Sequence, residues 1–227
     1  MSRGETLTDT RRSLHAVAEQ LLAGPQHRAI GSIRLRAEGD GFTTAEMPGD
    51  PSRLAVRSTT LMADRAGGQS SVPLSGSIAS LAAEIGVEPG PPIGVYDDGS
   101  GTDPSFLVIV DEEAAHEILR ALSWGDAALR QFAAAHATGT GAPEEPVLWP
   151  EHFDVAITLD EVNYGVSPGD AFIAEPYAYV GPWRQRQGSF WNQPFGAARP
   201  VRGLGNEPAV RAFFEEGRRA AASDPMG

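Results

Sequence analysis

The segment from His152 to Tyr179 carries the densest group of side chains in the sequence that could do chemistry. Apolar and polar residues alternate over 152–160 and again over 162–166, which is typical of half-buried strands, because successive side chains of a strand point to opposite faces. A third strand over 174–180 would complete an antiparallel meander and gather six polar side chains on one face. These candidate ligand-binding residues are His152, Asp154, Asn163, Glu175, Tyr177 and Tyr179.

Three chemistries fit such a face. His152, Asp154 and Glu175 could hold a divalent metal, because imidazole nitrogen and carboxylate oxygen are common ligands where thiolates are absent. The carboxylates could instead act as general acid and base, or join the phenols in a cage for a cationic ligand. The alternative is a polar sheet face that is solvated or packed under a helix. Our main hypothesis is binding of a small cationic or polar ligand, or of a divalent metal, and the sequence assigns no catalytic residue.

Composition excludes several classes of function. The chain has 227 residues, and its 18 basic and 30 acidic side chains give a formal net charge of −12. Every basic residue is arginine and cysteine is absent, which excludes lysine Schiff bases, catalytic thiols, thiolate metal sites and disulfides. An acidic chain repels the phosphates of nucleic acids and anionic membranes, so we expect neither as a partner. Without an apolar run long enough for a signal peptide or a membrane span, we expect a cytoplasmic protein.

Three recognisable motifs fail on closer inspection. His152-x-Asp154 on a strand is typical of iron/2-oxoacid oxygenases, but those sites need a later histidine and His152 is the last of five. Residues 165–169 fit the G-x-S-x-G string of hydrolases, but a proline follows the serine and no later histidine could act as base. The acidic stretch 97–103, DDGSGTD, lacks the ligand spacing of an EF-hand calcium loop.

The elements that must position the candidate face segregate along the chain. Helical signals cover residues 8–23, 77–86, 111–122, 126–136 and the segment after Asn206, and helix-stopping residues at Gly24-Pro25 end the first of them. Strand signals cover 29–37, 41–46, 54–62, 106–110 and the three strands above. This segregation predicts an α+β fold with antiparallel sheets, helices packed on one side and possibly two sheet-containing halves. We expect residues 1–227 to form a single compact unit with a weak internal boundary near 137–146.

An aromatic segment offers a second class of function. Trp183, Phe190, Trp191 and Phe195 lie in a Gly-, Pro- and Gln-rich stretch. Exposed together, these side chains would form the kind of apolar patch that marks an interface. The alternative hypothesis is therefore a non-enzymatic interaction module that forms a homodimer through residues 183–195.

Two sequence blocks also carry a resemblance. LWPEHFDVAITLDEVNYGVSPGD at 148–170 and EPYAYVGPW at 175–183 resemble the W-P-x-H-F-D, S-P-G-D and E-P-Y-x-Y-V-x-P-W blocks of an uncharacterised family of hypothetical proteins from high-GC bacteria. The resemblance extends to LAGPQHRAIGSIRLRAEGDGFTT at 22–44 and GVYDDGSG at 94–101. It implies that the chain is one unit, and it implies no activity and no role for any residue.

Overall fold

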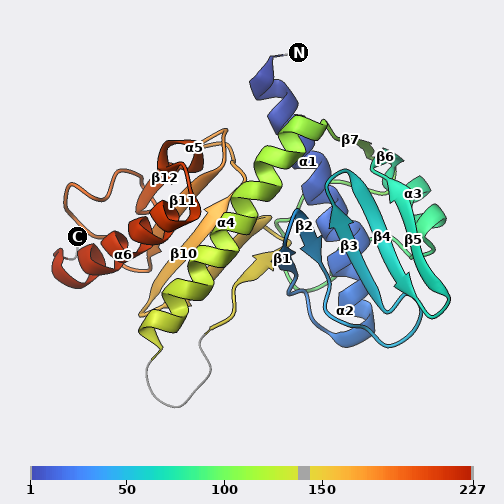
Figure 1. Ribbon diagram of the computed structural model, residues 1–227, viewed down its shortest axis with the longest axis horizontal. Coiled ribbons are helices and arrows are strands. Elements are labelled where there is room, and N and C mark those ends of the chain that lie inside the picture. Colours follow the sequence, from blue (N-terminus) through green and yellow to red (C-terminus); the bar gives the residue numbers. More distant parts are fainter. Residues whose placement is uncertain (1, 138–143, 226–227) are drawn as a thin grey trace. The chain divides into compact units, whose positions relative to one another are not determined.

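The computed structural model describes residues 2–137 and 144–225. The chain divides into two compact units, one formed by Met1–Arg120 with Leu148–Phe153 and the other by Ala121–Val147 with Asp154–Gly227. Each unit contains its own antiparallel sheet (Figure 1), so the predicted α+β class with two sheet-containing halves is confirmed. The predicted internal boundary at 137–146 lies mostly outside the described residues.

The first unit contains most of the elements in chain order. They are α1 (Arg3–Val17), a π-helix (Ala18–Ala23), α2 (Gly24–Ile30), β1 (Arg36–Glu38), β2 (Gly41–Thr43), β3 (Arg53–Arg57), β4 (Thr60–Arg65), β5 (Gly68–Pro73), β6 (Ser75–Ser77), α3 (Ile78–Ile85), β7 (Leu107–Ile109) and the start of α4 (Glu112–His136). Strands β1 to β5 form one antiparallel meander in sequential order, and β6 pairs with β7 (Figure 1). The ring of Phe153 stacks on His15 of α1 and meets Phe42 of β2 edge to face, at 5.7 and 5.4 Å between ring centroids. These contacts join the helix to the sheet.

The prediction that the first helix stops at Gly24-Pro25 is wrong, because the helix widens there instead. In the π-helix the Gly24 N–H bonds the carbonyl of Glu19, five residues back. Pro25 has no N–H for the carbonyl of Gln20, and the N–H of Gly90 donates to that carbonyl at 3.0 Å. A Cβ on Gly24 would lie 1.7 Å from the Gly90 oxygen, so glycine permits the approach of this loop.

Other helix and strand boundaries differ from the predicted ones for local reasons. The expected strand over 29–37 shrinks to β1, since α2 continues to Ile30 and ends at Gly31 in the left-handed region. The expected strand over 54–62 is the hairpin β3–β4, which turns at Ser58 with φ of 51°. The predicted helix after Ser77 is confirmed, with the Ser77 side chain accepting the N–H of Ser80 at 3.0 Å.

Helix α4 is continuous through the break expected between its predicted halves. Asp111 caps it by accepting the Ala114 N–H at 2.9 Å. A Cβ on Gly125 would lie 2.8 Å from the side chains of Val155 and Val166. Gly125 is therefore a contact point between the helix and the second sheet rather than a break.

The second unit places its sheet against the remainder of α4 and the last helix. Its elements are β9 (Asp154–Leu159), β10 (Val162–Ser167), β11 (Tyr177–Pro182), β12 (Ala197–Pro200), α5 (Val201–Leu204) and α6 (Glu207–Ser223), and the four strands pair in the order β12-β11-β10-β9. In β8 (Val147–Trp149) the chain passes from the second unit to the first.

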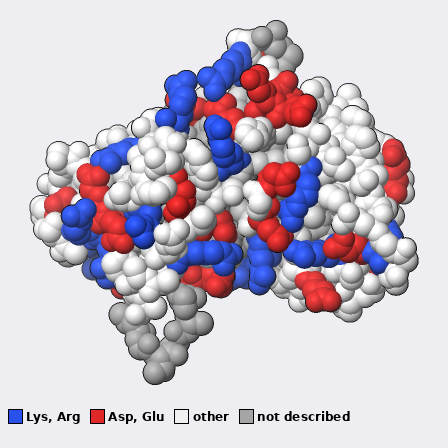
Figure 2. Space-filling model, viewed as in Figure 1, with Lys and Arg blue, Asp and Glu red and all other residues white. Residues whose placement is uncertain are grey.

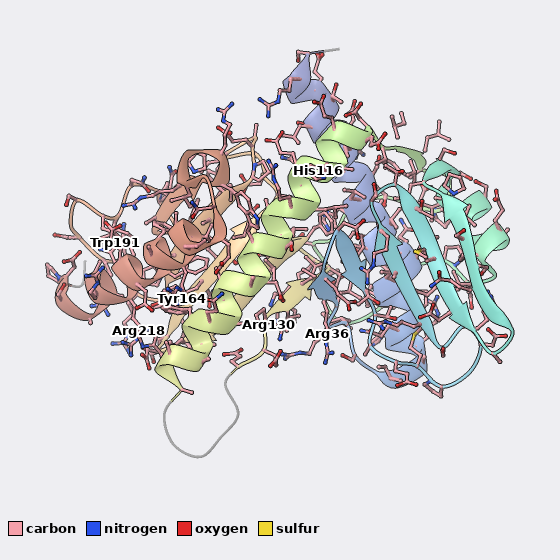
Figure 3. The ribbon with its side chains drawn as sticks, viewed as in Figure 1. Arg36, His116, Arg130, Tyr164, Trp191 and Arg218 are labelled. Carbon is pink, nitrogen blue, oxygen red and sulfur yellow. The ribbon has the colours of Figure 1, made fainter. Side chains whose placement is uncertain are left out.

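The core of the second unit is aromatic. Phe132 of α4, Tyr164 of β10 and Phe214 of α6 have ring centroids 4.7 to 6.1 Å apart (Figure 3 labels Tyr164). Asn206 caps α6 by accepting the Ala209 N–H at 3.0 Å, as the sequence predicts. One face of this sheet is thus covered by helices. Among the described residues, no helix combines the length and apolarity needed to span a bilayer.

Candidate functional site

The face of the second sheet opposite its helices carries four of the six predicted residues. Cross-strand pairs place Gly165 of β10 between Ala156 of β9 and Tyr179 of β11. Because directly paired residues point to the same face, Asp154, Asn163, Tyr177 and Tyr179 share that face, as the alternation predicts. We call it the polar sheet face.

Tyr179 and Asp154 form the centre of the polar sheet face. The Tyr179 hydroxyl donates a short hydrogen bond to Oδ2 of Asp154, which is 8% exposed. The Tyr179 ring lies across Gly165, where an added Cβ would come within 2.5 Å of it. Burial, and then the nearby Asp154 carboxylate, raise the pKa of Tyr179 well above its ordinary value. The phenol is therefore a fixed neutral donor.

A second phenol–carboxylate pair lies beside the first. The Tyr177 hydroxyl donates to Oδ2 of Asp170 at 2.5 Å, and the Tyr177 and Tyr179 rings are 6.3 Å apart. Burial and the bond to Asp170 raise the pKa of Tyr177. Asp170 was not among the predicted site residues. Its place in a Ser-Pro-Gly-Asp turn is typical of a capping residue, and it accepts the Phe172 N–H at 2.7 Å.

The two remaining predicted residues do not lie on the strands that define this face. Glu175 lies in the loop before β11 rather than in a strand, and it pairs with Arg202 at 3.3 Å. His152 is exposed in a turn that belongs to the first unit. Within residues 2–137 and 144–225, no three His, Cys, Asp or Glu side chains are placed to hold a metal ion. The predicted ligand set His152, Asp154 and Glu175 is thus not assembled.

The predicted aromatic segment is mostly packed within its own unit. The ring centroids of Phe190 and Phe213 are 5.5 Å apart. The indole N–H of Trp191, which Figure 3 labels, donates to Oδ2 of Asp224 at 3.0 Å. The ring centroids of Phe195 and Tyr177 are 6.3 Å apart. Residues 183–195 therefore do not form one continuous exposed patch.

Trp183 differs from the rest of that segment. It is 64% exposed, and its indole N–H donates to Oδ1 of Asn163 at 3.1 Å. The same Asn163 oxygen accepts the Thr158 hydroxyl at 2.9 Å. This contact places an exposed indole at the rim of the polar sheet face.

Neither the distribution of surface charge nor comparison with known proteins points to a particular function. On the face of the molecule in Figure 2, arginines are interspersed with acidic side chains rather than gathered in one patch. No family model, curated protein or solved structure matches this chain. Its function must be argued from its own side chains.

Proposed function

We propose that the second unit binds a small organic cation on the polar sheet face. The observation that carries the proposal is the pair of adjacent phenol–carboxylate contacts, Tyr179 with Asp154 and Tyr177 with Asp170. Two carboxylates beside two aromatic rings create a negative and polarisable surface. Such a surface favours an ammonium or guanidinium group and opposes an anion.

The phenols make the carboxylates selective for charged ligands over neutral ones. An ordinary phenol, with a pKa of about 10, is already protonated at neutral pH, and the pKa values of Tyr177 and Tyr179 are raised further. Both hydroxyls therefore donate to the carboxylates in the absence of a ligand. A ligand ammonium replaces a neutral donor with a charged one, and a charge-assisted hydrogen bond is roughly twice as strong as a neutral one. An uncharged ligand gains no such advantage.

The test is a screen of the full chain by thermal shift and calorimetry with alkylammonium and guanidinium compounds, each paired with a neutral analogue of the same shape. We expect binding of cations only, weakened at least about tenfold in Asp154→Asn, a loss typical for a charge-assisted contact. Asp170→Asn serves as a second variant should Asp154→Asn fold poorly. Glu175→Gln is the matched control, since that carboxylate precedes β11 and is already paired with Arg202. Equal binding of neutral analogues, or binding unchanged by both Asn variants, would contradict the proposal.

The alternative, a homodimer, has one observation in its favour. Phe172 and Trp183 of the second unit are 71% and 64% exposed, and aromatic side chains are enriched at protein interfaces. Light scattering on the full chain and on a Phe172→Ser/Trp183→Ser variant separates the two functions. A mass of two chains that the variant reduces to one favours the interaction module, and a single-chain mass for both proteins counts against it.

A further inference from the structure

A cluster of aromatic rings continues the polar sheet face toward solvent. The ring centroid of Tyr177 lies 6.3 Å from that of Phe195, and the Phe195 centroid lies 5.9 Å from that of Phe172. Tyr177 is 4% exposed, whereas Phe172 is 71% exposed. These three residues, which we call the aromatic cluster, therefore lead from a buried phenol of the proposed site to an exposed ring.

Asp170 connects the two ends of the aromatic cluster. Its Oδ2 accepts the Tyr177 hydroxyl at 2.5 Å, and its Oδ1 accepts the backbone N–H of Phe172 at 2.7 Å. Contacts thus run from Asp170 to Tyr177, on to Phe195 and Phe172, and back to Asp170. One carboxylate and three rings are held together by four direct contacts.

The turn that follows β10 fixes the position of this carboxylate. Oδ1 of Asp170 also accepts the N–H of Ile173 at 2.9 Å, and the Asp170 N–H donates to the Ile173 carbonyl at 2.8 Å. Just before it, Gly169 has a φ of 107° and donates its N–H to the Ser167 hydroxyl at 3.1 Å. The carboxylate is therefore ordered before a ligand arrives, which lowers the entropic cost of binding.

Asp170 retains the capacity to accept a hydrogen bond from a ligand. An ionised carboxylate offers about four lone-pair positions. Residues 2–137 and 144–225 fill three of these positions, with two N–H groups on Oδ1 and the Tyr177 hydroxyl on Oδ2. Asp170 is half-exposed, whereas Asp154 of the neighbouring pair is 8% exposed. A ligand bound at the two pairs therefore extends into solvent past Asp170.

The aromatic cluster combines a negative charge with an apolar surface. Glu175 is neutralised by its pair with Arg202 at 3.3 Å, whereas Asp170 forms no ion pair with any residue that the structure describes. The faces of aromatic rings attract cations, and the same rings remove apolar groups from water when a ligand covers them. This combination suits a ligand that carries both a cationic and an apolar part.

We propose that the cation of the polar sheet face carries an aryl or alkyl tail, and that this tail lies along Phe195 and Phe172. The inference rests on the proposed function, which places the ammonium head at the phenol–carboxylate pairs, and adds the class of ligand and the direction of its tail. A compact cation would leave the exposed Phe172 ring in water. An amphiphilic ammonium ion covers that ring and gains the free energy of burying apolar surface.

The experiment is calorimetric titration of the full chain with primary alkylammonium ions from methylammonium to hexylammonium, with hexanol as the neutral analogue of the longest. We expect affinity to rise about two- to fourfold for each methylene that the rings cover, since stabilisation follows the apolar area buried. Phe172→Ala, at an exposed position, should lower hexylammonium affinity about tenfold and leave methylammonium affinity unchanged, because only the longer ion reaches that ring. Hexanol should bind at least about tenfold more weakly than hexylammonium.

Trp183→Ala is the matched control. Its indole is 64% exposed at the rim of the same face, but it contacts Asn163 at the other end of β10. The variant should leave the rise of affinity with tail length unchanged. Equal affinities across the alkylammonium series, or an equal loss of hexylammonium binding in Phe172→Ala and Trp183→Ala, would overturn the inference.

Failure of the inference is distinguishable from failure of the proposed function. Equal binding of all alkylammonium ions without binding of hexanol removes the tail contact and keeps the cation site. Equal binding of hexanol and hexylammonium contradicts both. Light scattering of the same samples tests a second copy of the chain as the occupant: a two-chain mass that Phe172→Ala reduces to one would assign the ring to an interface and overturn the inference.

Discussion

The hydroxyl of Tyr179 reaches the carboxylate of Asp154 by crossing the backbone of the strand between them. The crossing is possible because that strand has Gly165 at the point of passage, where an added Cβ would lie 2.5 Å from the Tyr179 ring. A hydrogen bond between two strands of the second sheet therefore depends on a missing side chain in a third strand.

Gly165→Ala should destabilise the protein by about 1–3 kcal/mol, the usual cost of overpacking a filled position, because the ring must leave Asp154. Gly181→Ala is the matched control on the same face, where the nearest atom to a new Cβ is 3.5 Å away, and it should change stability little. Urea unfolding measures both. Adding Tyr179→Ala should recover part of the loss in Gly165→Ala, and strictly additive effects would refute this account.

All four tyrosines of the chain should resist ionisation until the protein unfolds. Burial is the main cause of a raised pKa at Tyr96, Tyr164, Tyr177 and Tyr179, and the sequence contains no other tyrosine. The unfolded chain loses phenolic protons above pH about 10 while the folded chain keeps them. Stability from these residues is therefore complete below that pH and falls above it, by up to about 1.4 kcal/mol per pH unit for each tyrosine.

Absorbance at the tyrosinate band, recorded together with circular dichroism during an alkaline titration, checks this prediction. The two signals should change at the same pH, above 10. A tyrosinate step near pH 10 in a protein that retains its folded spectrum would show that at least one of these phenols has an ordinary pKa.

His15 should contribute stability that acid removes. Its Nε2–H donates to the Pro150 carbonyl at 2.7 Å and its ring stacks on Phe153. Burial lowers the pKa of His15 from 6.5, so the unfolded chain takes up a proton first as the pH falls. The stability of the neutral imidazole is present above pH 6.5 and is lost below it.

NMR titration of the histidine ring protons should give His15 a pKa below 6.5. His15→Phe preserves the stacked ring but lacks the donor, and should cost about 1 kcal/mol at pH 8, typical for one hydrogen bond. The cost should shrink below pH 6. A cost that grows in acid would mean that the charged form of His15 is the favoured one.

Much of the second sheet could be predicted from sequence, because alternation in β9 and β10 is regular and fixes which side chains share a face. The face itself was predictable for Asp154, Asn163, Tyr177 and Tyr179. Glu175 was not, since nothing local shows that the strand begins only at Tyr177 and that Arg202 is the partner of Glu175.

The first unit was less predictable for a physical reason. Its π-helix receives a hydrogen bond from the distant Gly90 at the Gln20 carbonyl, and the buried Glu19 carboxylate accepts the N–H of Ser100, which is 81 positions away. In the stretch 97–103 the acidic Asp97 and Asp98 attract attention as possible calcium ligands, but they are exposed. Gly99, Ser100 and Thr102 resemble an ordinary loop in sequence. Strand β5 has little apolar alternation, and in the second unit β12 is only four residues long.

The two units are interleaved along the chain, which limits how they can be produced as separate fragments. The six residues Leu148–Phe153 belong to the first unit although they follow α4. A fragment ending before them would lose Phe153, which is 1% exposed between His15 and Phe42. No single cut yields both units intact, so a gene truncated directly after α4 would leave the first unit with an unfilled core.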